Sequence, residues 1–157
     1  MFNHEKLAEV ISAYKGYFPA HWNDEKYKWE AIQHFQKHWD IYADNFSEMF
    51  MKATERTRNL LANMNNYPCG MIKAFAESDA EETRGMFINL FDESKDLAER
   101  MEWFLASAEK LRVKYDDGNW HQHYQTQNTI TTYLWLKYPD KYYIYKYSEV
   151  CAFAKAI

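Results

Sequence analysis

The chain has few of the residues that make turns, linkers and disulfides. Its 157 residues include four glycines, three prolines and two cysteines. Scarce glycine and proline count against long β-meanders and flexible linkers. Cys69 and Cys151 can pair only if the fold brings them together. No signal peptide is recognisable at the start, because polar residues at positions 3–6 interrupt any apolar run. Free thiols and a cytoplasmic location are therefore favoured.

A basic excess and a long apolar run are also missing. The net charge is −4, whereas a domain that binds nucleic acid mainly through phosphates is usually basic. This charge counts against broad, non-specific DNA binding, although a small local basic face is compatible with it. No run approaches the ~20 apolar residues that cross a bilayer. We therefore expect a soluble protein with no membrane partner.

Signatures of catalysis and cofactor binding are absent as well. The four glycines, at positions 16, 70, 85 and 118, cannot build GxxxxGK[ST] or GxGxxG. Neither cysteine has a histidine at a recognisable spacing, and no GxSxG occurs. His34 and His38 lie one helical turn apart, but Phe35 stands where HExxH metalloproteases have glutamate. We predict that this chain is not an enzyme and holds neither a metal nor another cofactor.

Aromatic residues are what the chain has in excess, with 13 Tyr, 10 Phe and 6 Trp. With 47% hydrophobic residues the chain is too apolar for disorder, and it is long enough to bury roughly two-thirds of its unfolded surface. Tyrosine and tryptophan give large contact areas, but their polar tips need partners when they are buried. The composition therefore predicts a core filled with rings, an adhesive surface, or both.

Apolar residues recur at three- and four-residue spacing along most of the chain, which is typical of amphipathic helices. The predicted helices are a first one that ends at Gly16 and Pro19, then about 24–39, about 43–63, a short one around 71–75, one around 81–90, a long one around 95–111, about 122–137, and 148–157. We therefore predict one mainly α domain over residues 1–157, a bundle of about six to eight helices. A minor two-stranded element is left open at Tyr142–Tyr147 and Tyr17–Phe18.

Local signals predict where several of these helices begin and end. Ser78 and Glu81 have the spacing of a capping box, in which the hydroxyl accepts an orphan amide hydrogen and the carboxylate reaches back. Ser94 is expected to cap the longest helix, which residues 116–118 end, and Ser148 is expected to cap the last helix. That last helix has no polar tail, so it either docks on the body or belongs to a longer protein, of which this chain is the N-terminal module.

The densest aromatic segment, residues 133–150, holds six tyrosines and a tryptophan around a Pro139-Asp140 turn. Lysines alternate with the rings, and nucleic-acid bases stack on such rings while lysines follow phosphates. Packing of the rings in the core is the competing interpretation, and for Trp135 it is the favoured one. The candidate nucleic-acid-binding or partner-binding residues are Trp120, His121, His123, Lys137, Lys141, Tyr142, Tyr143, Tyr145 and Lys146.

Most of the chain resembles a known family. The segments that carry the resemblance are 18–22, 29–36, 86–100, 114–118 and 131–146, the last with Tyr-Pro-Asp-Lys-Tyr-Tyr. They are similar to the N-terminal region of bacterial AAA+ ATPases related to the McrB-like, 5-methylcytosine-type restriction proteins. The resemblance implies a specificity module whose ATPase or GTPase motor lies elsewhere and whose nuclease is a separate subunit. In relatives the module recognises modified DNA, in some cases by flipping a base into an aromatic pocket.

Two functions stay open at this point. The resemblance implies a non-catalytic recognition module of a bacterial defence ATPase that binds DNA, modified or plain, and that oligomerises through a linked motor. The alternative is a free-standing phage or mobile-element protein-interaction module that inhibits or decoys a defence nuclease complex. The first predicts a local positive face at Lys137, Lys141 and Lys146 beside exposed rings. The second predicts an exposed apolar or acidic patch.

Overall fold

The computed structural model describes residues 3–61 and 67–157, and within these ranges it contains nine helices and no strand. The helices are α1 (His4–Glu25), α2 (Tyr27–His38), α3 (Phe46–Ala53), α4 (Arg58–Leu61), α5 (Pro68–Ser78), α6 (Ala80–Leu90), α7 (Leu97–Tyr115), α8 (Gln127–Lys137) and α9 (Tyr147–Ala156). The predicted mainly α bundle is confirmed, with nine helices in the described ranges where six to eight were expected.

The minor two-stranded element that the sequence left open does not form in the described part of the chain. Tyr17 and Phe18 lie inside α1. The backbone of Tyr145 bonds to side chains of α8 instead of to a second strand. Its N–H donates to Thr131 Oγ1 at 2.9 Å, and its carbonyl accepts from Asn128 Nδ2 at 2.8 Å. Because α8 already satisfies these groups, residues 139–146 run from α8 to α9 as an irregular segment.

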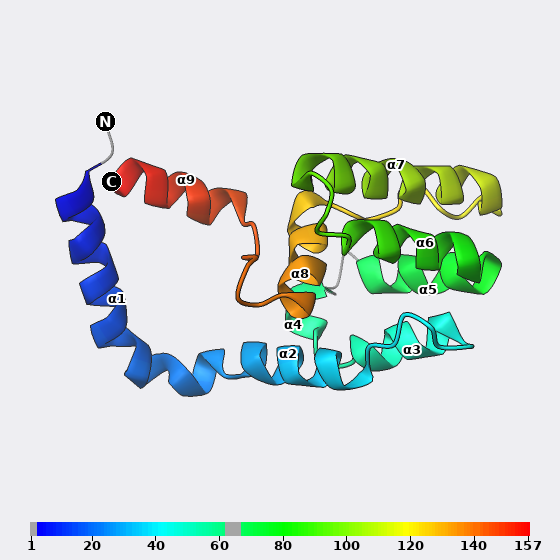
Figure 1. The fold of residues 1–157 in the computed structure, drawn as a ribbon. Coiled ribbons are helices and arrows are strands. Elements are labelled where there is room, and N and C mark those ends of the chain that lie inside the picture. The colour runs from blue at the N-terminus through cyan, green and yellow to red at the C-terminus, as the bar shows by residue number, and fades with distance from the viewer. Residues whose placement is uncertain (1–2, 62–66) are drawn as a thin grey trace.

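Helices α2 to α8 enclose a core made largely of aromatic rings (Figure 1). Phe87 lies near its centre, with ring centroids 5.3 Å from those of both Phe104 and Tyr133. All three side chains are fully buried. Edge-to-face pairs of this kind add about 0.5–1.5 kcal/mol each to the effect of burial. The hydroxyl of Tyr133 donates to Gln125 at 3.1 Å, so its polar tip is satisfied inside the core.

Three of the predicted helix caps are wrong, for related reasons. Asp79, not Ser78, caps α6, and its side chain accepts the amide of residue 82 at 3.0 Å. Asp96, not Ser94, caps α7 and accepts two amides there. Aspartate equals serine as an N-cap and adds a charge that favours the positive end of the helix. Ser148 lies within α9, which begins one residue earlier without a side-chain cap.

Several helix boundaries also differ from the expected ones. The helix expected over 43–63 is divided at Thr54 and Thr57, whose buried hydroxyls donate to backbone carbonyls and compete with helix continuation. Residue 63 and the following turn cluster up to 66 lie outside the described residues, and Pro68 opens α5 in the first helical turn. Helix α8 begins at residue 127 and not near 122, after the N-cap Thr126. The predicted break after α7 is confirmed at Gly118, where φ is 98°.

The first helix departs most from the prediction, because α1 continues through Gly16 and Pro19. With 22 residues it is longer than α7, which has 19. At about 100° per residue, Gly16 falls on the face opposite Phe18, and Pro19 falls beside the apolar face; both are exposed. Water can hydrate the carbonyl that the proline leaves unbonded at this exposed position, so the helix does not end there. In the described ranges no helix has the combined length and apolarity of a membrane span.

Residues 3–25 and 147–157 form an arm that stands away from the bundle (Figure 1). Neither α1 nor α9 contains a buried residue. Their tips meet where the N–H of Asn3 donates to the carbonyl of Ile157 at 3.1 Å. The last helix is therefore not buried against the bundle, and its end contacts the first helix instead. A closed loop of chain results, in which Lys26 joins α1 to α2 and residues 138–146 join α8 to α9.

Candidate functional site

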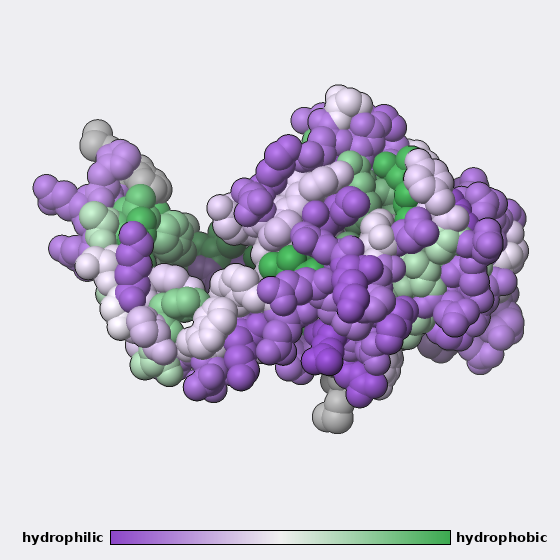
Figure 2. Space-filling model, turned by 60° about the horizontal axis from the view of Figure 1, so that its bottom comes forward, coloured by the Kyte–Doolittle hydropathy of each residue, from purple (hydrophilic) through white to green (hydrophobic). Residues whose placement is uncertain are grey.

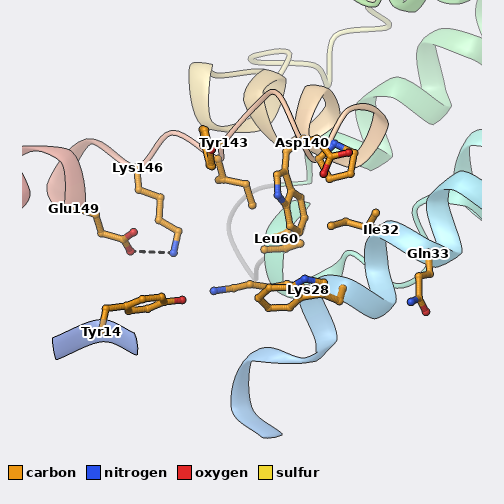
Figure 3. A pocket seen from close by; sticks show the side chains of 13 residues that line it. Tyr14, Lys28, Ile32, Gln33, Leu60, Asp140, Tyr143, Lys146 and Glu149 are labelled. Carbon is orange, nitrogen blue, oxygen red and sulfur yellow. Dashed lines mark hydrogen bonds and ion pairs between the residues drawn. The ribbon is translucent and has the colours of Figure 1, made fainter. Parts of the chain in front are cut away.

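A cleft of about 660 Å³ opens between the arm and the bundle (Figure 3). Its floor comes from α2, α4 and α8, and its sides come from α1, α9 and the segment 139–146. The arm's closure on itself creates this arrangement, because it holds α1 and α9 opposite the bundle. In the space-filling view of Figure 2, apolar side chains gather on the arm and along the depression beside it.

A ladder of four rings runs from α1 into α2, and its two end members, Tyr14 and Trp29, line the cleft. Tyr14, Phe18 and Trp22 follow one another at four-residue spacing, which places them on one face of the helix. The centroids of Tyr14 and Phe18 are 5.5 Å apart, and those of Trp22 and Trp29 are 5.2 Å apart across the bend at Lys26. The ladder therefore fixes the angle between α1 and α2 while three of its four rings remain exposed.

Two further rings line the cleft, Trp135 of α8 on its floor and Tyr143 on its side. The sequence favoured a core position for Trp135, but its ring is only partly buried, packing on the core from the cleft side. Tyr143 is 79% exposed, as the alternation of Tyr142 to Tyr145 predicted for some of these rings. Rings from four separate parts of the chain thus line one cavity.

Ion pairs occupy the cationic groups of the cleft. Lys146 Nζ lies 3.0 Å from Glu149 Oε1 (Figure 3). Lys28 pairs with Glu25. Partial burial by itself lowers the pKa of Lys28, but the hydrogen bond to Glu25 and neighbouring carboxylates outweigh it and raise that pKa. Asp140, at the rim, has neither a hydrogen bond nor an ion pair with any residue that the structure describes. The lining contains two lysines and two carboxylates, and Asp140 has no cationic partner among the described residues because Lys28 pairs with Glu25, which lies outside the lining.

Only two of the nine residues predicted as site residues, Tyr143 and Lys146, line the cleft. Lys141 lies outside it, with Nζ 2.8 Å from Glu93, and Lys137 lies over the rings of Phe91 and Tyr138. The remaining two tyrosines, Tyr142 and Tyr145, are partly buried and hold the segment to α7 and α8 respectively. Two of the three candidate lysines, Lys141 and Lys146, are thus paired with carboxylates, which offset their positive charge.

Of the three candidates near residue 120, Trp120 and His123 make contacts within the bundle. Trp120 is partly buried with its ring 5.7 Å from that of Phe75, and its carbonyl accepts from Arg112 at 2.8 Å. The ring of His123 accepts the amide of residue 125 at 3.0 Å, and partial burial lowers the pKa of this histidine. His121 is exposed. The structure does not bring these three residues to the cleft.

No metal centre is apparent in the described ranges, where no three His, Cys, Asp or Glu residues are grouped to hold an ion. The two histidines one turn apart in α2 bond to backbone carbonyls instead. His34 Nε2 lies 2.9 Å from the carbonyl of Lys52, and His38 Nδ1 lies 2.8 Å from the carbonyl of His34. These contacts account for one nitrogen of each ring, and they fix the side chains against α2 and α3.

Sequence reasoning missed most residues of the cleft, Tyr14, Trp29, Asp140 and Glu149 among them. One available signal was the apolar face of the first helix. No neighbouring segment of the sequence was an obvious partner to cover that face. No protein-family model, curated protein or solved structure matches this chain. The function therefore has to be argued from the geometry of the arm and the cleft.

Proposed function

We propose that this chain is a non-catalytic recognition module that binds a partner protein through the arm and the cleft. The gathering of exposed apolar and aromatic side chains at this end of the molecule carries the proposal. Ile11, Tyr14, Tyr17, Trp22, Trp29, Tyr143, Tyr147, Val150 and Phe153 are each at least 41% exposed. A contiguous apolar surface marks interaction sites, and tyrosine and tryptophan are enriched in protein interfaces.

The energetics of the arm support a partner. Helices in proteins are stabilised mainly by packing of an apolar face, which α1 and α9 achieve only in part. Covering one large apolar side chain contributes about 1.5–3 kcal/mol relative to leaving it in water. The arm therefore exposes apolar surface, and a bound protein that covers this surface stabilises the complex.

DNA binding, which the resemblance to McrB-like N-terminal regions implies, is the second candidate, and Tyr143 beside Lys146 favours it as an exposed ring next to a cation. Exposed ion pairs are worth only about 0–1 kcal/mol, so a phosphate can displace a carboxylate from a lysine. Doing so leaves Glu93 and Glu149 uncompensated beside the phosphates, in a chain of net charge −4. Because of this repulsion, we favour a protein partner over DNA.

The resemblance supports a place for the module in bacterial defence. As the N-terminal part of a restriction ATPase it would bring a second protein to the motor. As a free-standing protein of a phage or mobile element it would bind and inhibit such a complex. Both settings require a protein contact, and neither requires chemistry in this chain.

Site-specific photo-crosslinking in the native cells tests the proposal. Benzoylphenylalanine replaces Tyr17 on the arm or Tyr143 in the cleft, with Val113 on α7 as the control because it is 65% exposed and far from the arm in sequence. We expect one and the same protease-sensitive adduct from both test positions and none from Val113. That adduct should disappear when Trp29→Ser is added. A nuclease-sensitive adduct overturns the proposal in favour of DNA, and equal labelling from Val113 or no adduct overturns it outright.

A further inference from the structure

We infer that the cleft binds a proline-rich segment of the partner in the polyproline II conformation, with a basic residue beside it. The inference rests on the proposed function and names the ligand class. Proline-rich segments bind grooves lined with aromatic rings, and they enter them at low entropic cost because the conformation is already formed. Trp29, Trp135, Tyr14 and Tyr143 supply such rings from four parts of the chain.

The hydrogen-bonding groups of the cleft distinguish this ligand from others. Neither the indole N–H of Trp29 nor that of Trp135 donates to any group in the described ranges, and the same holds for the hydroxyls of Tyr14 and Tyr143. Indole is a donor and never an acceptor. Elsewhere the tyrosine hydroxyls are used, as in the bond from Tyr138 to the carbonyl of Phe91 at 2.9 Å.

An excess of donors calls for a ligand rich in carbonyls and poor in N–H groups. A polyproline II segment has this character, because its carbonyls are free of internal hydrogen bonds and proline has no N–H. A bound helix would satisfy its own backbone and leave the donors of the cleft unused. A bound strand needs a sheet edge, and the described part of the chain contains no strand.

The charges of the cleft set the composition and direction of the segment. Lys28 and Lys146 are already paired with carboxylates, whereas Asp140 has no partner among the described residues. Asp140 lies at the end of the cleft away from Tyr14 and Glu149 (Figure 3). An arginine or lysine of the ligand therefore belongs at the Asp140 end. The volume of about 660 Å³ falls within the ~300–1,000 Å³ of ordinary ligand pockets.

The test is a titration of the full chain with two capped peptides of ten prolines. One peptide carries a single arginine at its N-terminal end and the other carries it at its C-terminal end. Binding is followed by the indole ¹H–¹⁵N signals of the tryptophans, assigned by single substitution. We expect the Trp29 and Trp135 signals to move and that of Trp103, on α7, to stay. Trp29→Leu and Tyr143→Leu should each weaken binding at least ~10-fold, and Trp103→Leu should change it less than twofold.

Two further comparisons sharpen the test. Asp140→Asn should weaken the arginine-bearing peptide ~3–10-fold and leave plain decaproline unchanged. Tyr143→Phe, which keeps the ring and loses the hydroxyl, should weaken both about threefold. If no indole signal moves at millimolar peptide, or if the Trp103 signal moves equally, the inference is wrong. The proposed function is tested separately, by the crosslinking experiment. If that experiment identifies a partner protein without a proline-rich segment, the ligand class is wrong and the proposed function stands.

Discussion

The bundle and the arm use the same kinds of side chain in opposite ways. In the bundle, Phe87, Phe104 and Tyr133 are fully buried, and the one hydroxyl among them is satisfied. In the arm and cleft, Tyr14 and Tyr143 expose more than half of their surface and their hydroxyls have no partner in the described ranges. A buried ring whose polar group is hydrogen-bonded helps to specify the fold. An exposed ring whose polar group has no partner is suited to recognition. An aromatic-rich composition therefore predicts neither role until the topology is known.

The strongest test of this contrast is truncation of one ring in each region. Phe87→Ala removes a ring with six aromatic neighbours and should lower the free energy of unfolding by about 3–5 kcal/mol. Tyr17→Ala, on the exposed arm, should change it by less than ~0.5 kcal/mol. Urea denaturation followed by circular dichroism measures both. Similar losses from the two substitutions would mean that the arm is part of the core in solution.

Trp135 sharpens the contrast because its ring belongs to both regions, packing on the core and lining the cleft. Trp135→Ala should lower the free energy of unfolding by about 2 kcal/mol, less than a fully buried ring would, since only part of its surface is removed from water. It should also abolish binding to the cleft at a temperature where the protein is still folded. Trp120→Ala is the matched control: it should destabilise the protein and leave ligand binding intact.

Helical periodicity predicted the bundle because each of its helices buries one apolar face. Ile32 and Phe35 in α2, and Met86 and Leu90 in α6, are buried at the spacing that the sequence shows. Helix ends were predicted less well. Neighbouring serine and aspartate residues have nearly equal capping strength, and only tertiary geometry selected Asp79.

The cleft was beyond sequence reasoning for a different reason. Its walls join residues as distant as Tyr14 and Glu149, and no local pattern states that α1 and α9 meet at their tips. Pro19 was expected to end the first helix, but a proline at an exposed position of a helix removes one hydrogen bond without stopping it. Because α1 continues past Pro19, Trp22 lies on the same helix as Phe18, and both rings belong to the aromatic ladder.

A smaller effect is expected where the two regions are joined. Tyr142 accepts from Arg100 Nη2 at 2.9 Å and donates to Glu93 at 3.1 Å, which ties the segment leading to α9 onto α7. Tyr142→Phe removes both bonds and should cost about 1–2 kcal/mol of stability. Hydrogen exchange should quicken in residues 147–157 and stay unchanged in α6. Equal protection in the arm would show that its position does not depend on this anchor.

The smallest expected effect is a pH dependence confined to the bundle. Asp79 accepts the amide of residue 82, the hydroxyl of Tyr115 and the ammonium of Lys114, and these bonds lower its pKa from 3.8 to about 2. A carboxyl with a lowered folded-state pKa stabilises the protein above pH ~4, and the stabilisation is lost as the pH falls through about 2. Asp79→Asn keeps a capping side chain but cannot titrate. Its melting temperature should therefore fall less between pH 4 and pH 2 than that of the parent protein. Parallel curves would show that other carboxylates carry the acid sensitivity of the bundle.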